Sequence, residues 1–195
     1  MGSLLLLAAF MAGALPAGER VIAVAPVGDV PPDAVSLLLP TLRDTFGAEV
    51  VIAPAVPLPS RAYDRRRRQH LSTALLDALA QARRPGWDRL LGVADVDLFV
   101  PELNFVFGEG DPIRGVAVFS LQRLRAEGEA SGRELLARRA ATEAIHELGH
   151  SYGLGHCGDA HCVMWFSNSL AETDRKGTRL CAAHAVELRR LRGRR

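Results

Sequence analysis

This sequence has few cysteines, a small net charge and few long apolar runs. Its three cysteines, Cys157, Cys162 and Cys181, lie in the last quarter of the chain, and an odd number cannot form a complete disulfide framework. Their position near histidines indicates metal binding instead. A net charge of +2 excludes a polyelectrolyte, and the chain has no internal repeat. With 195 residues, 48% of them hydrophobic, the chain is long enough for one buried core and favours a single domain.

The longest apolar run lies at the N-terminus and leaves two interpretations open. It extends from Leu4 to about Ala17, which is the length of a signal-peptide core and too short to cross a bilayer. Small residues at positions 12–14 would serve as a cleavage site, but no Lys or Arg precedes the run. We therefore expect residues 1–20 to be a signal peptide or a disordered leader, and residues 21–195 to be the folded domain. The protein would accordingly be exported or cytoplasmic.

Positive charge is clustered in two places, at residues 65–68 (RRRR) and in the C-terminal tail (RRLRGRR). Such runs can bind phosphate or an acidic surface. Neither run is interleaved with the aromatic side chains that single-strand binders use, which favours a solvated helix start and a basic chain end. We therefore expect no nucleic-acid partner.

Apolar strands alternate with amphipathic helices in the first half of the chain. We predict strands over residues 21–27, 49–53 and 88–93, and helices over about residues 32–46, closed by a glycine, and about residues 65–83. The order β, α, β, α, β predicts an α/β core with helices laid on a mixed sheet.

The second half is predicted to contain two apolar runs followed by two helices. The runs at residues 104–110 (NFVFGEG) and 114–121 (RGVAVFSL) are joined by a turn and indicate a hairpin or two neighbouring edge strands. A long helix is predicted over about residues 133–152 from its apolar periodicity, and a final helix over about residues 182–192.

The long predicted helix carries the sequence HELGHSYGLGH. Residues four apart lie on one face of a helix, so His146 and His150 can bind a single metal ion, and imidazole is a good ligand for zinc. Glu147 is then placed to take a proton from water on the metal. Gly153 would end the helix and let the chain double back, which brings His156 as a third nitrogen ligand.

Three protein ligands would leave one coordination position open, which is typical of catalytic rather than structural zinc. Water there would have a pKa of roughly 7, and with Glu147 as base it would attack a polarised peptide carbonyl. An isolated HExxH occurs by chance on helices, but H-E-x-x-H-x-x-G-x-x-H is the longer metzincin pattern. Met164 would be the methionine of the tight turn beneath the metal, or else a core methionine. The predicted chemistry is peptide-bond hydrolysis.

The cysteines and several flanking segments extend this pattern. His156 and Cys157 begin the arrangement H-C-x4-C-x-M, and the chain also contains DLFVPELN, NFVFGEG and SNSLAETDRKG. Together these segments closely resemble the archaemetzincin family of zinc peptidases, over nearly the whole chain from about Val21 to the last helix. The resemblance implies an α/β, metzincin-like zincin domain with a twisted mixed β-sheet, a long active-site helix, a Met-turn and a C-terminal helix. It also implies a catalytic zinc on His146, His150 and His156, with Glu147 as general base and Met164 in the Met-turn.

The same resemblance implies a second, structural zinc. The family holds it with four cysteines, two of which match Cys157 and Cys162, but this chain departs from the family's final C-x-x-C and reads Cys181-Ala-Ala-His184. Three thiolates and one imidazole are a sound tetrahedral set for zinc, so His184 is the predicted fourth ligand and His161 its competitor. We therefore expect two zinc ions per chain, one catalytic and one structural.

Further expectations concern the surroundings of the catalytic zinc. Glu143 lies on the same helical stripe as the ligands, so it could orient a ligand histidine or form an i,i+4 ion pair with Arg139. Metzincins present an edge strand to which substrate pairs by strand addition, and Val116–Ser120 is the candidate. We expect a peptide or protein substrate, no stable membrane span and a monomer. The alternative function is a zinc-stabilised binding protein with little hydrolytic activity, against which Glu147 argues.

Overall fold

The computed structural model of the chain describes residues 20–125 and 132–193. The signal peptide or leader expected over residues 1–20 therefore falls, except for Arg20, outside the described residues. Within the two described stretches, no helix is both long enough and apolar enough to cross a membrane.

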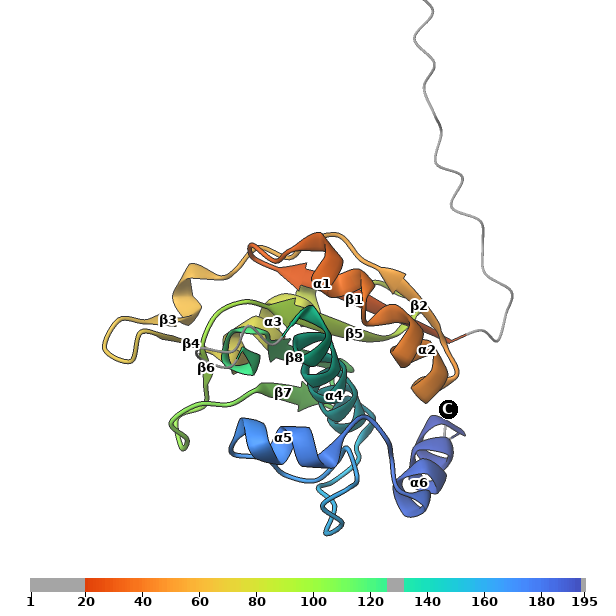
Figure 1. Cartoon of the computed structure of the whole chain (residues 1–195). Coiled ribbons are helices and arrows are strands. Elements are labelled where there is room, and N and C mark those ends of the chain that lie inside the picture. Colours follow the sequence, from red (N-terminus) through yellow and green to blue (C-terminus); the bar gives the residue numbers. More distant parts are fainter. Residues whose placement is uncertain (1–19, 126–131, 194–195) are drawn as a thin grey trace, which may run out of the picture.

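The central element is a twisted five-stranded sheet (Figure 1). Its strands are β1 (Val21–Val27), β2 (Glu49–Ile52), β5 (Trp87–Ala94), β7 (Gly108–Asp111) and β8 (Val116–Ser120). Their spatial order is β2-β1-β5-β8-β7, and all neighbours pair in parallel except β7, which is antiparallel to β8. A mixed sheet in an α/β domain confirms the predicted fold class.

Helices cover both faces of this sheet (Figure 1). They are α1 (Pro32–Ser36), α2 (Leu39–Phe46), α3 (Ser72–Ala82), α4 (Arg133–Tyr152), α5 (Leu170–Lys176) and α6 (Ala182–Gly193), with 3-10 turns η1 (Ser60–Ala62) and η2 (Gln122–Leu124). The long helix α4 shares its face of the sheet with α1 and α2, while α3 covers the other face. Both α5 and α6 contact α4.

Side chains of the sheet alternate between two apolar cores, one on each face. Ile22 and Val24 of β1 belong to the core under α4, whereas Ala23 and Ala25 belong to the core under α3. This alternation follows from the two-residue repeat of a strand. Because helices bury both faces, the inner strands β1, β5 and β8 are mostly apolar, which is why their positions were predictable from the sequence.

The first predicted helix is divided into α1 and α2. Pro40, in the first turn of α2, has no N–H to donate to the Ser36 carbonyl, and its ring collides with the preceding turn, so a continuous helix is excluded. Gly47 closes α2 as expected, with a positive φ of 51° and its N–H donated to the Arg43 carbonyl at 2.8 Å.

The helix predicted over residues 65–83 is wrong in its first third. Residues 65–68 instead form the tip of an antiparallel hairpin between β3 (Tyr63–Asp64) and β4 (Gln69–Leu71), and β4 continues into a small sheet with β6 (Leu98–Phe99). The Asp64 carboxylate accepts the backbone N–H groups of Arg66 and Arg67, at 2.8 and 3.0 Å. This turn competes with helix formation, although arginine itself favours helices.

Helix α5 is absent from the prediction. Ser169 caps it: its Oγ accepts the Glu172 N–H at 3.3 Å, and the Glu172 carboxylate accepts the Asn168 N–H at 2.7 Å. The sequence S-x-x-E is that of a capping box, although the Glu172 carboxylate accepts the N–H of the residue before the cap and not that of Ser169, so the signal for the helix was present in the sequence.

The prediction that Val116–Ser120 is an edge strand is also wrong. These residues form β8, which lies between β5 and β7, and every one of them is buried. The edge position belongs to β7 on this side of the sheet. The composition explains the arrangement, because the apolar sequence VAVFS suits the sheet interior and the sequence GEGD suits an exposed edge.

Candidate metal centres

The end of α4 and the loop after it bring the three motif histidines together. His146 and His150 lie one turn apart, with 3.0 Å between their Nε2 atoms. Gly153 ends α4 in the left-handed region, at a φ of 98°, so the chain reverses and returns His156 to the same place. The ligand atoms of the three rings all lie within 4.8 Å of one another. Tetrahedral zinc requires nitrogen atoms about 3.4 Å apart, so this set fits zinc.

Backbone carbonyls orient two of the rings. The Nδ1 of His146 lies 2.7 Å from the Val163 carbonyl oxygen, and the Nδ1 of His150 lies 2.9 Å from the Leu154 carbonyl oxygen. A hydrogen bond to a carbonyl requires the proton on Nδ1, which leaves the Nε2 lone pair for a metal ion. The fold thus selects the ring tautomer that zinc needs.

Burial keeps these rings neutral. It lowers the pKa of His150 to about 4 and the pKa of His146 well below its usual value, and it also lowers the pKa of His156. At His146 the effect is increased by the Lys176 ammonium, whose Nζ lies 3.4 Å from Nδ1. Neutral imidazole is the form that binds metal, so these rings need lose no proton at neutral pH.

Glu147 lies beside the histidines and is only 4% exposed. Burial raises the pKa of its carboxyl well above the usual range; the carboxylates of Glu143 and Glu109 act in the same direction, and the Lys176 ammonium opposes them. The edge strand β7 packs directly over it, since a Cβ atom on Gly108 would lie 2.5 Å from the Glu147 Cγ. A buried carboxyl with raised proton affinity suits a general base.

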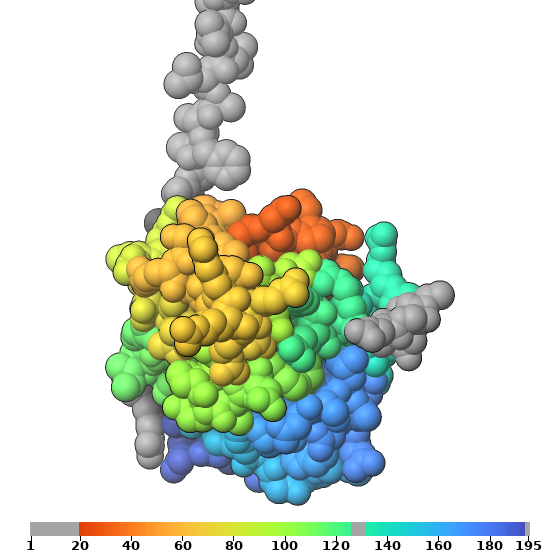
Figure 2. All heavy atoms as spheres, turned by 90° about the vertical axis from the view of Figure 1, so that its left-hand side faces the viewer, coloured from red at the N-terminus to blue at the C-terminus, as the bar shows by residue number. Residues whose placement is uncertain are grey.

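A cleft of about 250 Å³ opens beside Glu147 and the three histidines. Its walls come from α4, from β7 and the segment before it, and from residues 166–168 before α5. Figure 2 shows the light-green surface of β7 and the segment before it bordering the blue surface of the chain after α4. The apolar lining consists of Val100, Leu103, Phe105, Val106, Phe107 and Phe166.

The Glu143 carboxylate pairs with α5. It lies 3.1 Å from the Lys176 Nζ, and the Thr173 hydroxyl donates to it at 3.0 Å. Arg139, the partner considered from the i,i+4 spacing, directs its guanidinium to Asp174, with contacts of 2.9 and 2.7 Å. Lys176 lines the cleft and was not identified from the sequence, because its partner lies on a different helix.

Met164 is fully buried beneath the helix turn that carries His146 and His150. A Cβ atom on Gly149 would lie only 2.5 Å from the Met164 Sδ, so glycine at this position lets the methionine approach the helix. The Cys157 N–H donates to the Met164 carbonyl oxygen at 2.9 Å, which closes the loop between them. Met164 thus packs directly under the helix turn that carries the two histidines.

A second cluster of possible metal ligands begins at Cys157, directly after His156 in the sequence. Cys157, Cys162, Cys181 and His184 place their ligand atoms within 4.8 Å of one another. The Cys157 and Cys181 sulfur atoms are 3.8 Å apart, and the His184 Nδ1 lies 3.3 Å from the Cys181 sulfur and 3.8 Å from that of Cys162. Zinc–sulfur bonds of about 2.3 Å require tetrahedral sulfur atoms about 3.8 Å apart, so this set also fits zinc.

The sequence left two histidines as candidates for the fourth position of this cluster. The His161 side chain is mostly exposed and its ring lies near Asp159, whereas His184, in the first turn of α6, faces the sulfur atoms. Hydrogen bonds from the His184 backbone and ring lower the pKa of the Cys181 thiol to about 6, which favours the thiolate. The geometry therefore favours His184 as the fourth member of the set.

Comparison with known proteins gives consistent matches over most of the chain. The model of peptidase family M54 matches residues 48–190. The archaemetzincin of Pyrococcus furiosus is 44% identical over 168 residues, which cover 82% of this chain and 88% of the relative. The archaemetzincin of Methanocaldococcus jannaschii is 41% identical, with 82% and 88% covered. The crystal structure of the Methanopyrus kandleri archaemetzincin superposes with a TM-score of 0.82 at 35% identity, covering 93% of this chain and all of that one.

Proposed function

The chain belongs to peptidase family M54, the family of the archaemetzincins, and is a zinc metallopeptidase; from this premise we propose which residues perform the reaction. His146, His150 and His156 hold the catalytic zinc, and Glu147 is the general base of peptide-bond hydrolysis. The observation that carries this proposal is the convergence on one cleft of three histidines, two of them with the tautomer fixed by backbone carbonyls, and a buried carboxylate.

The histidine set supports a catalytic rather than a structural ion. Within the described part of the chain, three side chains make up this group, so a tetrahedral ion would keep one position for water or for a substrate carbonyl. All three histidines and Glu147 line the cleft, so a ligand in the cleft would have access to an ion held there. When bound, zinc supplies a Lewis acid that polarises the peptide carbonyl and lowers the pKa of water.

Glu147 supplies the proton transfers. Its carboxylate takes the proton of the attacking water and then gives it to the leaving amine nitrogen. Burial among other carboxylates increases its proton affinity, which favours the first transfer, and the nearby Lys176 ammonium limits that increase. The packing of β7 against α4 at Gly108 and Gly110 holds the carboxylate and the edge strand at a fixed separation.

The substrate is expected to bind along β7. An extended peptide can add to a sheet edge through main-chain hydrogen bonds, and β7 is the edge strand beside the cleft. This assignment replaces the interior strand Val116–Ser120 in that role. Glycines at positions 108 and 110 let the strand lie close to the helix, so a bound peptide would place its carbonyls near the histidines.

The second cluster is proposed as a structural zinc site with the ligands Cys157, Cys162, Cys181 and His184. Four protein ligands close a tetrahedron, which is the arrangement of structural zinc. The site would link the loop after His156 to the start of α6 and so hold the third histidine in place. Cys157 follows His156 directly, so any movement of this cluster is transmitted to the catalytic one.

The decisive experiment compares the wild type with Glu147→Gln on a peptide library, with bound zinc counted in both proteins. The amide keeps the size of the side chain but cannot accept the proton, so cleavage should fall by at least about 100-fold while the zinc content stays the same. Equal turnover by the two proteins would overturn the peptidase mechanism. A wild-type protein that binds zinc and peptides without cleaving them would instead be a zinc-stabilised binding protein.

A further inference from the structure

Two large apolar side chains in the wall of the cleft are exposed. Leu103 is 41% exposed and Phe166 is 42% exposed, and both line the cleft from different segments. Leu103 belongs to residues 100–105, the roof loop, which follows β6; Phe166 follows the Met-turn, with its ring 5.0 Å from the His156 ring. Exposed apolar groups from two separate segments that line one cleft are typical of a binding site.

The roof loop is held from outside by one arginine of the hairpin tip. The Arg67 guanidinium donates to the carbonyl oxygens of Leu103 and Asn104 and stacks over the Phe99 ring, 4.3 Å from its centre. The Gln69 amide adds a bond of 2.8 Å to the Asn104 carbonyl. Within the loop the Leu103 N–H donates to the Val100 carbonyl oxygen at 3.1 Å, so the contacts of Arg67 and Gln69 add to this turn and connect it to the hairpin.

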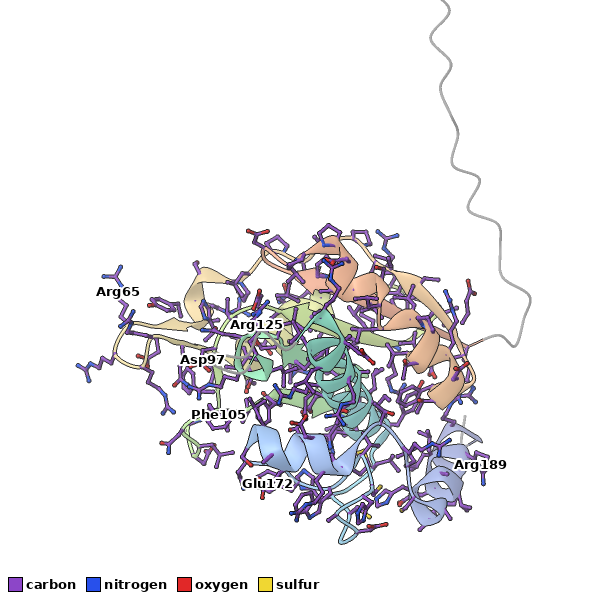
Figure 3. All side chains as sticks on the ribbon, viewed as in Figure 1. Arg65, Asp97, Phe105, Arg125, Glu172 and Arg189 are labelled. Atoms are coloured by element: carbon purple, nitrogen blue, oxygen red, sulfur yellow. The ribbon has the colours of Figure 1, made fainter. Side chains whose placement is uncertain are left out.

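A second arginine, Arg123, contacts the roof loop at Phe105. The Arg123 guanidinium lies 4.2 Å from the centre of the Phe105 ring and donates to the Asp97 carboxylate, which also accepts from Gln69 at 3.1 Å. Figure 3 shows Asp97 and Phe105 close together on the side of the molecule from which the hairpin projects. The hairpin and the roof loop are therefore one connected unit.

The other arginines of the hairpin tip differ from Arg67. Arg65, Arg66 and Arg68 are exposed, and Figure 3 shows Arg65 pointing away from the body of the protein. Arg67 is the half-buried member of the run. The four-arginine run therefore divides into solvated residues and one residue whose hydrogen bonds reach the cleft wall.

We propose that Arg67 is a positioning residue of the substrate cleft: it holds the roof loop so that the space between Leu103 and Phe166 takes a large apolar side chain of the peptide substrate. This inference rests on the proposed peptidase function, because it assigns a substrate class to the same cleft. Besides the reacting groups, the charged side chains that line the cleft have partners: the buried Lys176 ammonium pairs with Glu143, and the Glu109 carboxylate accepts hydrogen bonds from the Ser72 and Thr73 hydroxyls. An apolar side chain therefore meets apolar walls next to the reacting groups.

The test measures binding without turnover. Fluorescein-labelled heptapeptide pools, each with one position fixed as Phe, Leu, Ala or Asp, are titrated by fluorescence anisotropy into zinc-loaded Glu147→Gln protein. The same titrations are made with Arg67→Ala, Arg67→Lys, Arg66→Ala and Phe166→Ala added to that protein. Arg66→Ala is the matched control, since it removes the same charge from the same hairpin tip without touching the roof loop.

The pools with Phe or Leu at one position should bind about 10-fold more tightly than the pool with Ala there, as expected for burying a large apolar side chain. Arg67→Ala and Phe166→Ala should reduce this preference to about 2- to 3-fold, Arg67→Lys should keep part of it, and Arg66→Ala should keep it all. Should Arg67→Ala not fold, Arg67→Lys and Phe166→Ala carry the comparison.

Two results would overturn the proposal. One is an apolar preference that is equal in the Arg67→Ala and Arg66→Ala variants. The other is a preference of the parent Glu147→Gln protein for Asp, or for none of the four side chains. Neither depends on catalysis. A protein that shows the apolar preference but cleaves no peptide with Glu147 intact would contradict the proposed function and leave this inference standing.

Discussion

Lys176 on α5 and Glu143 on α4 form a fully buried ion pair, 3.1 Å between Nζ and Oε1, in the wall of the catalytic cleft. The pair joins α5 to the helix turn just before His146. A buried ion pair contributes little net stability compared with apolar side chains, but removing one partner leaves an uncompensated charge. The pair therefore makes the position of α5, and of the cleft wall that precedes it, depend on two side chains.

Lys176→Met should destabilise the protein strongly. It leaves the Glu143 carboxylate buried without its cation, which costs about 3–5 kcal/mol in the free energy of unfolding. Adding Glu143→Gln to the same protein should recover most of this loss, since neither side chain of the pair then carries a charge. Urea denaturation of the single and double variants measures both effects. Arg138→Met, which breaks an exposed ion pair with Asp174, is the control and should cost no more than about 1 kcal/mol.

Gly108→Ala should impair catalysis through the backbone of β7. The added methyl would lie 2.4 Å from the Val118 carbonyl oxygen and 2.5 Å from the Glu147 Cγ, so strand and helix must move apart. Overpacking of this kind costs about 1–3 kcal/mol of stability. Because Glu147 is displaced, kcat should fall by more than 10-fold. Gly158→Ala is the control, as nothing lies within 4 Å of a Cβ atom there; similar losses in both variants would show that Gly108 has no special role.

His184→Ala should remove one zinc ion of the two expected, because the cysteine cluster loses a ligand. Thermal stability should fall with it, since a structural zinc contributes directly to folding. His184→Cys, which completes a four-cysteine set, should retain both ions. His161→Ala should change neither the zinc count nor the melting temperature, because the His161 side chain is exposed. Atomic absorption together with thermal melts gives both readouts, and loss of zinc in His161→Ala would reverse the ligand assignment.

The parts of the fold that were predictable are those with a strong local pattern. β1 and α4 have the predicted bounds, because two-sided burial makes the strand continuously apolar and the metal motif marks the helix end at Gly153. The hairpin tip was mistaken for a helix because four arginines favour a helix individually, and the Asx turn at Asp64 is a weaker sequence signal. A local pattern therefore predicts an element well when the tertiary environment reinforces it.

The candidate metal ligands could be named from the sequence, whereas the contacts that support them could not. Helical spacing places His146 and His150 together, but the pairing of Glu143 with Lys176 joins residues on separate helices. The same is true of Arg67, which lies at the tip of the β3–β4 hairpin and donates hydrogen bonds to the roof loop after β6. Long-range polar contacts carry no periodic signal, so a structure is needed to find them.

The pair of Arg139 and Asp174 should make stability depend on pH in the acid range. Arg139 is buried, and its hydrogen bonds hold the pKa of the Asp174 carboxyl below the usual 3.8. A carboxyl whose pKa is depressed in the folded state contributes stability above the unfolded pKa and loses it as the pH falls through the folded value. Asp174→Asn should therefore be less stable than the wild type by about 2–3 kcal/mol at pH 6 to 7.

This difference should shrink below about pH 4, once the wild-type carboxyl is protonated as well. Chemical denaturation at a series of pH values gives the free energy of unfolding of both proteins. The difference between the two values at each pH removes the effects of all other groups that titrate in both proteins. Asp44→Asn, at an exposed position on α2, is the matched control for removing a helix carboxylate. A difference for Asp174→Asn that stayed constant from pH 7 to pH 3 would show that its charge is not what stabilises the link between α4 and α5.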